Sequence, residues 1–294
     1  MTEKYIDLHT HSNASDGSFT PSEIFKLAGE SGLSAVALTD HDTVSGISEF
    51  LKSAEENDSC TAIPGVEISV DLGGSEVHIV GLFIDHNCPS LLKLLTEIRV
   101  NRDSRNSVII DKLQAMGYDI SLHEVNSTAG GESVGRPHFA KILIEKGYFL
   151  RPQEVFDKCL KRGASAYCTR KLPSPEEAIR EIHKAGGLAF WAHAVYRLKN
   201  ERTFVRRIIK KLIACEIDGV EAYYSTYSPA QQNMMIGFAE EFNLLKSGGS
   251  DFHGSNQPAV SLGTGINGTL KVPADILLEM NDTIDRKKRT EPAL

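Results

Sequence analysis

The chain of 294 residues lacks the usual marks of a secreted or membrane-bound protein. Its five cysteines are an odd number and form no Cys-x-x-Cys pair, so we expect free thiols in a reducing compartment. No apolar run approaches the ~18 residues that a membrane span needs. Residues 1–5 lead straight into the first expected strand, which leaves no room for a signal peptide. Together these absences predict a cytoplasmic protein.

Excess basic charge and the common phosphate-binding loops are also missing. The net charge is −7 at pH 7 and the sequence pI is about 5.8, so we expect no binding to long duplex nucleic acid. Because the sequence has no apolar run long enough for a span, we also expect no membrane partner. The sequence has neither a Gly-x-x-x-x-Gly-Lys loop nor a Gly-x-Ser-x-Gly elbow. A P-loop enzyme and a serine hydrolase therefore have no support. Charged residues make up 24% and hydrophobic residues 41%, which is ordinary for a globular protein.

What the chain does contain is histidine at the ends of apolar segments. Residues 5–8 have the pattern of a short strand, and His9 and His11 follow it directly. Residues two apart in an extended segment point to the same side, so both imidazoles can reach one ion. Asp16 lies in the next turn and can face the same pocket. Taken alone, a His-x-His pair at a strand end could equally be a surface accident.

The same arrangement recurs along the chain, and six of the ten histidines take part. Asp40 and His41 follow the apolar residues 34–38. A single histidine at a strand end is commonly a structural residue, but repeated placements are typical of a β/α barrel that presents ligands at the carboxyl ends of its strands. Histidine and carboxylate ligands suit zinc, manganese or iron. The remaining candidates are Glu67 after residues 62–66, His78 within residues 77–82, His193 after residues 188–192, and Asp251 and His253 after residues 247–250.

The middle of the chain has a different pattern from its two ends. About 85 residues at the start alternate strand and helix patterns, which favours βα units and a parallel sheet. Residues 89–171 show no strand pattern, and the alternation then resumes. We therefore predict a barrel formed by residues 1–88 and 172–294, with a helical insertion over its mouth. Within the insertion the periodicity predicts helices at residues 91–116, 137–146 and 152–161.

Together the motifs resemble those of the PHP (polymerase and histidinol phosphatase) family of metal-dependent phosphoesterases. They occur in the family's order over nearly the whole chain. The resemblance implies an α/β fold, a distorted seven-stranded barrel of PHP type that carries two or three divalent ions (manganese, zinc or iron). The motifs are Asp7-Leu8-His9-Thr10-His11, Ser15-Asp16-Gly17, Thr39-Asp40-His41-Asp42, Gly65-Val66-Glu67, His78, Ala192-His193 and Ser250-Asp251-Phe252-His253.

The resemblance also implies a set of ligands for each ion. The first ion would be bound by His9, His11, Glu67 and Asp251. The second would be bound by Glu67, His78 and His193, and the third by Asp16, His41 and His253. A hydroxide that bridges the first two ions near Glu67 would attack the phosphate. His193 or a metal-bound water would protonate the leaving group. The remaining acids of the motifs, Asp7, Asp40 and Asp42, would orient imidazoles or cap turns.

Substrate choice is expected to depend on the segment Gly135-Arg136-Pro137-His138 in the insertion. An arginine beside a helix amino terminus can grip an anion. Arg136 could instead pair with a surface carboxylate while His138 packs on its helix. The resemblance to the PHP subgroup that acts on nucleotide phosphates favours substrate binding by both residues. Five other basic residues, each expected to be a solvated charge, are weaker candidates: Arg99, Arg102, Arg105, Arg170 and Lys171.

The predicted activity is hydrolysis of a phosphate monoester of a small nucleotide, with the 3′-phosphate of a nucleoside 3′,5′-bisphosphate preferred. A 5′→3′ exonuclease acting on short oligoribonucleotides is a related possibility, because both reactions cut a 3′ phosphoester beside a 5′-phosphate. A histidinol-phosphate phosphatase is less favoured, since the insertion fits the nucleotide subgroup better. A non-catalytic metal-binding regulatory module is also less favoured, since all nine expected ligands are present. Each of the three enzymes would take a small phosphorylated substrate as its partner.

Overall fold

The computed structural model describes residues 4–57, 59–128, 133–195 and 201–290. Its central feature is a seven-stranded sheet in which the strands follow one another in chain order. A separate two-stranded sheet pairs β8 (Val260–Ser261) with β9 (Gly265–Ile266). The strands of the main sheet are β1 (Ile6–Asp7), β2 (Ala35–Leu38), β3 (Thr61–Asp71), β4 (Glu76–Leu82), β5 (Leu188–Trp191), β6 (Gly219–Tyr224) and β7 (Leu245–Gly249).

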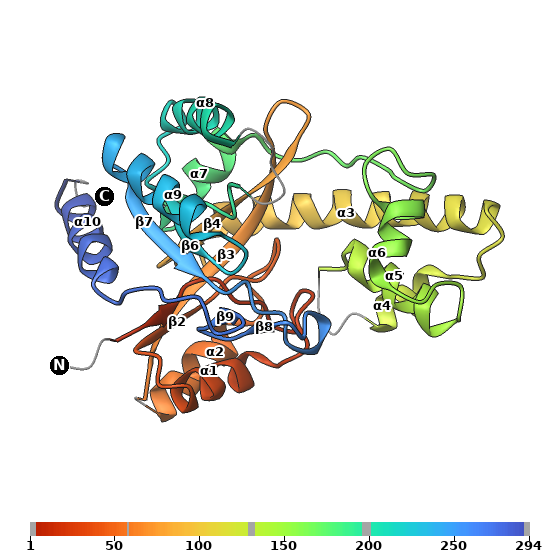
Figure 1. The fold of residues 1–294 in the computed structure, drawn as a ribbon, viewed down its shortest axis with the longest axis horizontal. Helices are drawn as coiled ribbons and strands as arrows, with labels where there is room; N and C mark the ends of the chain where they lie inside the picture. Colours follow the sequence, from red (N-terminus) through yellow and green to blue (C-terminus); the bar gives the residue numbers. More distant parts are fainter. Residues whose placement is uncertain (1–3, 58, 129–132, 196–200, 291–294) are drawn as a thin grey trace.

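The first and last strands of the main sheet meet, so the sheet forms a nearly closed barrel (Figure 1). The backbone N–H of Leu8 donates to the carbonyl of Gly248 over 3.0 Å. Beyond the strands, Thr10 and Phe252 continue this pairing as a parallel bridge. The seven-stranded barrel that was predicted is therefore confirmed.

One strand of the barrel runs against its neighbours, so the prediction of a parallel sheet is wrong at this point. β4 is antiparallel to both β3 and β5, because residues 72–75 turn the chain back with no helix between β3 and β4. Glu67 was expected just after a strand but lies within β3, which continues to Asp71. His78 lies near the start of β4. Since β4 is reversed, its start lies at the barrel end where the parallel strands finish.

Alternate residues of each strand pack into two different cores, as the period of a β-strand requires. Ala35 and Ala37 face the barrel interior, where they belong to the same cluster as Phe190. Val36 and Leu38 point outward and belong to the cluster that includes the apolar faces of the surrounding helices. The helices around the barrel are α1 (Pro21–Glu30), α2 (Ile47–Glu56), α7 (Pro175–Lys184), α8 (Glu201–Ile213), α9 (Pro229–Glu241) and α10 (Ile276–Thr290).

A long helix, α3 (Pro89–Ala115), leaves the barrel and extends to a second group of helices (Figure 1). Leu91 and Leu95, in its first turns, belong to the outer core of the barrel. Ile109 and Leu113, near its end, belong to a separate core formed with other helices. α3 and α5 (Arg136–Glu145) confirm the predicted helices at 91–116 and 137–146 to within two residues. The other elements here are α4 (Leu122–Thr128), α6 (Pro152–Val155) and a π-helical turn (Phe156–Leu160).

The helices show three further local features. α1 begins at the capping box formed by Thr20 and Glu23, in which each side chain accepts the other residue's backbone N–H. The third predicted helix, at 152–161, is a short α6 followed by the π-helical turn, and α4 was not predicted. Among the described residues, no helix is long and apolar enough to cross a membrane.

Candidate metal centre

The nine side chains predicted as metal ligands lie together at one end of the barrel, and we call them the metal-ligand cluster. They come from the carboxyl ends of β1, β2, β5 and β7, the turn before α1, and the β3–β4 hairpin. Glu67 is at the centre, because one carboxylate oxygen lies 2.8 Å from His78 Nδ1 and 2.9 Å from His193 Nε2. Its other oxygen lies within 3.4 Å of a nitrogen of each of three further imidazoles, those of His9, His11 and His41.

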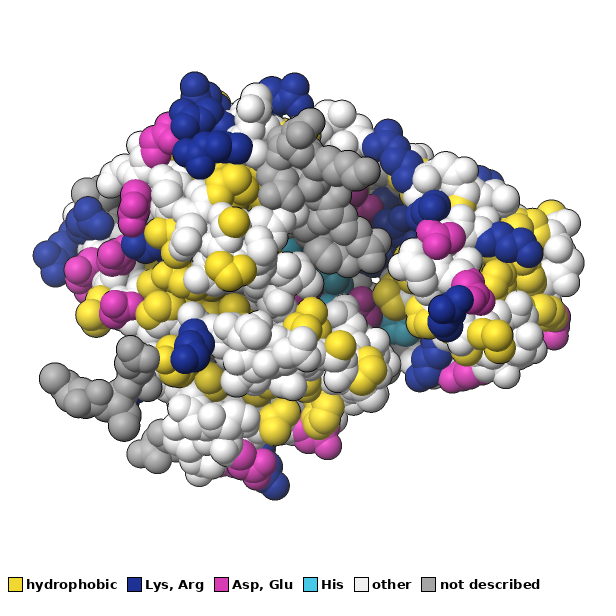
Figure 2. Space-filling model, in the orientation of Figure 1, with side chains coloured by type: hydrophobic (Ala, Val, Ile, Leu, Met, Phe, Trp, Pro, Cys, Tyr) yellow, Lys and Arg dark blue, Asp and Glu magenta, His cyan; other side chains and the backbone are white. Residues whose placement is uncertain are grey.

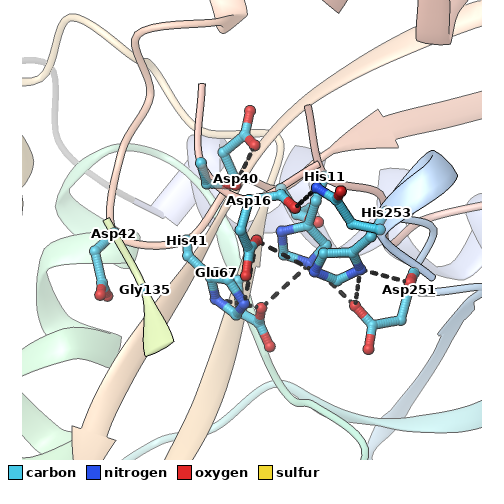
Figure 3. A network of polar contacts seen from close by, with 12 residues as sticks. His11, Asp16, Asp40, His41, Asp42, Glu67, Gly135, Asp251 and His253 are labelled. Carbon is cyan, nitrogen blue, oxygen red and sulfur yellow. Dashed lines mark hydrogen bonds and ion pairs between the residues drawn. The ribbon is translucent and has the colours of Figure 1, made fainter. Parts of the chain in front are cut away.

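Two further carboxylates complete the metal-ligand cluster (Figure 3). Asp251 Oδ1 lies 3.1 Å from His11 Nε2 and 3.5 Å from His253 Nδ1. Asp16 Oδ1 lies 3.2 Å from His253 Nε2 and 3.9 Å from His41 Nε2. Each of the six imidazoles of the cluster therefore contacts at least one carboxylate of the same cluster.

Eight of the nine side chains, all except His193, supply donor atoms to three groups in which all atoms lie within 4.8 Å of one another. Each group has at least three ligands, so each is large enough for one ion. The grouping departs from the predicted one, since His41 lies with Glu67 and His78, and His11 belongs to two groups. The groups are His9, His11 and Asp251; His41, Glu67 and His78; and His11, Asp16, His41 and His253.

The metal-ligand cluster contains buried polar atoms that have no hydrogen-bond partner within the described residues. Such an atom costs about 1–3 kcal/mol when it stays unsatisfied. A divalent cation would satisfy several of them at once, and nitrogen and oxygen donors are those that manganese, iron and zinc accept. The residues therefore fit a multinuclear metal centre. The atoms are His9 Nε2, His11 Nδ1 and Nε2, Asp16 Oδ1, His41 Nδ1 and Glu67 Oε2.

Charge in the cluster favours the forms that bind cations at Glu67 and His11. Burial raises the pKa of Glu67, but the imidazoles of His41 and His78 hold that pKa well below its usual range. Burial, with His253 and His41 nearby, lowers the pKa of His11 to about 3. The central carboxylate is thus ionised and the His11 imidazole neutral at neutral pH, as metal coordination requires. At His41 and His253 the nearby carboxylates outweigh burial and raise the pKa to about 9 and about 10, so a cation would displace their protons.

Two side chains of β6 that sequence reasoning missed hold the ligands in place. Glu221 Oε1 lies 3.0 Å from His9 Nδ1, and its Oε2 accepts the backbone N–H of His193 at 2.5 Å. The hydroxyl of Tyr224 donates to Asp251 Oδ2 over 2.8 Å. Carboxylates that bond the far nitrogen of a ligating histidine fix its orientation. A glutamate within a buried apolar strand was the signal that could have revealed Glu221.

Close packing and unusual backbone angles also position the ligands. His193 and Asp251 have φ of 32° and 58°, in the left-handed region that non-glycine residues rarely adopt. Gly249 passes so close to the first strand that an added Cβ would lie 2.4 Å from His9 Cβ. Such conformations persist where the surroundings hold them, and they are common at functional sites.

Asp7, Asp40 and Asp42, which were expected to orient imidazoles or cap turns, differ in the groups that they contact. Asp40 accepts the backbone N–H of Ser12 at 2.8 Å and the hydroxyl of Ser15 at 2.5 Å, and so fixes the loop between the first ligands. Asp7 likewise accepts the N–H of Ser250 at 2.8 Å. Asp42 does neither, and Figure 3 shows its side chain pointing away from the imidazoles.

Asp42 instead lies in a second polar group, which we call the arginine cluster. It consists of Arg102, Arg105, Arg136 and Arg170 with two carboxylates, Asp42 and Glu76. Arg102 pairs with Asp42 Oδ2, and Arg170 reaches the same oxygen at 3.2 Å and Glu76 Oε1 at 2.9 Å. Arg102 and Arg105 are buried and the side chain of Arg170 is only 3% exposed, so the expectation of solvated charges is wrong for all three.

The predicted substrate-binding residues lie beside this cluster. Arg136, at the start of α5, donates to Glu76 Oε2 over 3.0 Å, and its guanidinium lies 5.8 Å from the centre of the Tyr167 ring. His138 is buried, and its Nδ1 accepts the backbone N–H of Gly135 at 3.0 Å. Arg136 lines the cavity that lies between the two clusters, whereas His138 is not among the described residues that line it.

A cavity of about 930 Å³ joins the two clusters. Figure 2 shows the hollow, with histidine side chains inside it and Lys and Arg side chains on the side of the second helical group. Six residues of the metal-ligand cluster line it: Asp16, His41, His78, His193, Asp251 and His253. The cationic lining residues are Arg102, Arg105, Arg136, Lys161 and Arg162.

Known proteins resemble this chain over most of its length. Residues 7–120 match the family model described as the PHP domain. The chain is 38% identical over 253 residues to a 5′-3′ exoribonuclease of Haemophilus influenzae, covering 86% of this chain and 91% of that protein. It is 34% identical over 262 residues to a 3′,5′-nucleoside bisphosphate phosphatase of Chromobacterium violaceum, covering 88% and 90%.

A solved structure agrees with these relatives. A protein of Bifidobacterium adolescentis, described as a metal-dependent phosphoesterase, superimposes with a TM-score of 0.82 at 26% identity, covering 94% of this chain and 95% of that one. The barrel, the convergent histidines and carboxylates, and these similarities point to one conclusion: the chain belongs to the PHP family and is a metal-dependent phosphoesterase.

Proposed function

We propose that the enzyme removes the 3′-phosphate of a nucleoside 3′,5′-bisphosphate, giving the 5′-monophosphate and inorganic phosphate. The observation that supports this is the cavity with two unlike walls, one of metal ligands and one of arginines. A bisphosphate has two anionic groups, so one can react at the metal-ligand cluster while the other lies against the cationic wall. The name of the relative from Chromobacterium violaceum is consistent with this substrate.

The metal-ligand cluster would hold two or three divalent ions, with manganese, zinc or iron as candidates. His9, His11, Glu67 and Asp251 are proposed for the first ion, Glu67, His78 and His193 for the second, and Asp16, His41 and His253 for the third. Bound ions supply Lewis acidity and lower the pKa of water from 15.7 to about 7 in favourable cases.

The chain's own side chains account for orientation and binding. In the reaction a water oxygen adds to phosphorus, the bond from phosphorus to the 3′ oxygen breaks, and that oxygen takes up a proton. His193 lines the cavity and its backbone N–H donates to Glu221, so either His193 or a water molecule beside it would supply that proton. Arg136 is proposed to bind phosphate, helped by the amino terminus of α5, where Gly135 and Pro137 also line the cavity. His138 supports this segment by capping the helix.

The second candidate is 5′→3′ exonucleolytic cleavage of short oligoribonucleotides. The observation that favours it is the 38% identity to the exoribonuclease of Haemophilus influenzae. The same site can serve both reactions, because an oligonucleotide with a 5′-phosphate presents the same pair of phosphates at its first nucleotide.

The barrel and the second helical group have separate hydrophobic cores, which supports a separate function for each. We propose that residues 1–88 and 172–294 form the catalytic barrel and that residues 89–171 form an insertion that selects the substrate. The separate core of α3 to α6 and the arginines that α3 and α5 contribute support this division. A reducing compartment such as the cytoplasm is also proposed, which the five free cysteines support.

Phosphate release by the manganese-loaded enzyme tests the proposal. Adenosine 3′,5′-bisphosphate, a 5′-phosphorylated diribonucleotide, adenosine 5′-monophosphate and histidinol phosphate would be compared. We expect the bisphosphate to be hydrolysed best and the 5′-monophosphate to remain intact. Asp251→Asn should abolish the reaction, whereas Glu56→Gln on the exposed end of α2 should not. Cleavage of the dinucleotide alone would favour the exonuclease, and release from histidinol phosphate alone would overturn the nucleotide substrate.

A further inference from the structure

The charges of the arginine cluster do not balance. Four guanidinium groups face two carboxylates, those of Asp42 and Glu76. Arg102 and Arg105 are 6% and 4% exposed, and the side chain of Arg170 is 3% exposed. Buried charges are normally paired, because removing an ion from water is costly. The cluster therefore carries two positive charges that the described protein groups leave unmatched.

The imbalance is concentrated at one residue, Arg105. It is 4% exposed and lines the cavity, yet its Nε and one terminal nitrogen donate only to the side-chain oxygen of Asn106, at 3.1 and 2.9 Å. No carboxylate of the described residues forms an ion pair with it. Burial, together with Arg102, Arg170 and Arg136, lowers the pKa of Arg105 to about 9, so the group is still charged at neutral pH.

The surroundings hold Arg105 in this position. The amide nitrogen of Asn106, which is fully buried, donates to the carbonyl of Val134 over 3.1 Å, so the amide oxygen is turned towards the guanidinium. The other arginines already have carboxylate partners: Asp42 for Arg102 and Arg170, and Glu76 for Arg136 and Arg170. Arg105 is thus a preorganised cation that faces the cavity with hydrogen-bonding capacity to spare.

We infer that Arg105 binds the phosphate group that is not hydrolysed and so determines the preference for doubly phosphorylated nucleotides. A phosphate dianion matches the two unmatched positive charges, and a planar guanidinium suits its oxygens. This inference rests on the proposed function, because it takes the reacting phosphate to lie at the metal-ligand cluster. Arg105 is a specificity-determining residue, and the reacting phosphate is bound without it.

Two variants and a matched control test the inference. Arg105→Met removes the charge, and Arg105→Lys keeps the charge but lacks the planar guanidinium that can bind two oxygens at once. The control, Lys93→Met, removes an exposed cation from the same helix. With the manganese-loaded enzyme, kcat/KM is measured for adenosine 3′,5′-bisphosphate and for adenosine 3′-monophosphate. We expect Arg105→Met to lower the value for the bisphosphate by roughly tenfold to a hundredfold and to leave the 3′-monophosphate nearly unchanged. Equal losses for both substrates would overturn the inference.

A binding measurement covers the case in which turnover is weak. Calorimetry gives the affinity for adenosine 5′-monophosphate while saturating inorganic phosphate occupies the metal side of the cavity. The affinity should fall in both Arg105 variants and stay unchanged in Lys93→Met. If Arg105→Met does not fold, an unchanged affinity in Arg105→Lys overturns the inference. If the wild type fails to hydrolyse the bisphosphate but binds the 5′-monophosphate through Arg105, the proposed function fails and the phosphate subsite stands.

Discussion

The metal-ligand cluster and the arginine cluster are two buried polar assemblies on one cavity, and they are opposite in character. The first has carboxylates and imidazole nitrogens with unsatisfied lone pairs, such as Oε2 of Glu67. The second has two more guanidinium groups than carboxylates. The metal-ligand cluster is therefore suited to bind cations, and the arginine cluster is suited to bind an anion. A substrate with one phosphate on the metal ions and another on the arginines meets both requirements.

The two clusters also differ in how the fold builds them. The metal ligands project from strand ends and hairpin residues of a single barrel. The arginines come from α3, α5 and the segment at residue 170, and form ion pairs with Asp42 and Glu76 of the barrel. Chemistry thus depends on the barrel, while selection depends on how the second helical group packs against it. A change within one cluster should therefore spare the other.

Removing the central carboxylate should have the largest effect. Glu67→Gln eliminates the acid that contacts five imidazoles, and kcat/KM should fall by about a thousandfold or more. Phosphate release and metal content by atomic emission would be measured beside Glu56→Gln. Full metal content with undiminished turnover would show that the metal-ligand cluster is not the reaction centre.

Breaking the arginine cluster should reduce stability but leave the metals in place. Asp42→Asn leaves Arg102 and Arg170 without their shared partner, and loss of one partner of a buried pair costs about 3–5 kcal/mol. Urea unfolding should show this loss, and metal content should be normal. Asp111→Asn, on the exposed face of α3, is the control. An unchanged free energy of unfolding would mean that the cluster is not a buried ion-pair network.

Loosening one ligand should have an intermediate effect. Glu221→Gln weakens the hold on His9 while keeping the shape of the side chain, and such changes typically cost 10–100-fold in metal affinity. Competition with a chelating dye gives the affinity, with Glu240→Gln on the surface of α9 as control. The orienting role would be excluded by an affinity equal to that of the wild type.

The smallest effect is expected outside both clusters, at Asp218. Burial raises the pKa of this carboxyl group, but His183 and Lys287, at 2.7 and 2.5 Å, hold it below its ordinary value of 3.8. Because the folded pKa is depressed, its stabilising contribution is complete above about pH 3.8 and is lost as the pH falls through the folded value.

Asp218→Asn should therefore unfold more easily than the wild type at pH 7, by about 1 kcal/mol. The difference should shrink as the pH falls below 3.8, in urea titrations at several pH values. A difference that stayed constant over this range would contradict the assigned ion pairs.

The contrast between the clusters also explains what the sequence could predict. Ligands such as His9 and His11 follow apolar runs within a few residues, so local periodicity reveals both the strand and the ligand. The strand that holds Glu221 and the reversal of β4 depend on which segments pair across the barrel, which local patterns do not encode. Arg102 and Arg105 looked like surface charges because only tertiary packing places Asp42 and the cavity beside α3.

A crystal structure of the manganese-loaded enzyme with adenosine 5′-monophosphate and inorganic phosphate tests the complementarity of the two clusters most directly. We expect manganese anomalous peaks among the nine metal ligands, inorganic phosphate beside them, and the nucleotide's 5′-phosphate within hydrogen-bonding distance of Arg105 and Arg136. A 5′-phosphate bound at the metal ions, with the arginine cluster contacting only protein, would contradict it.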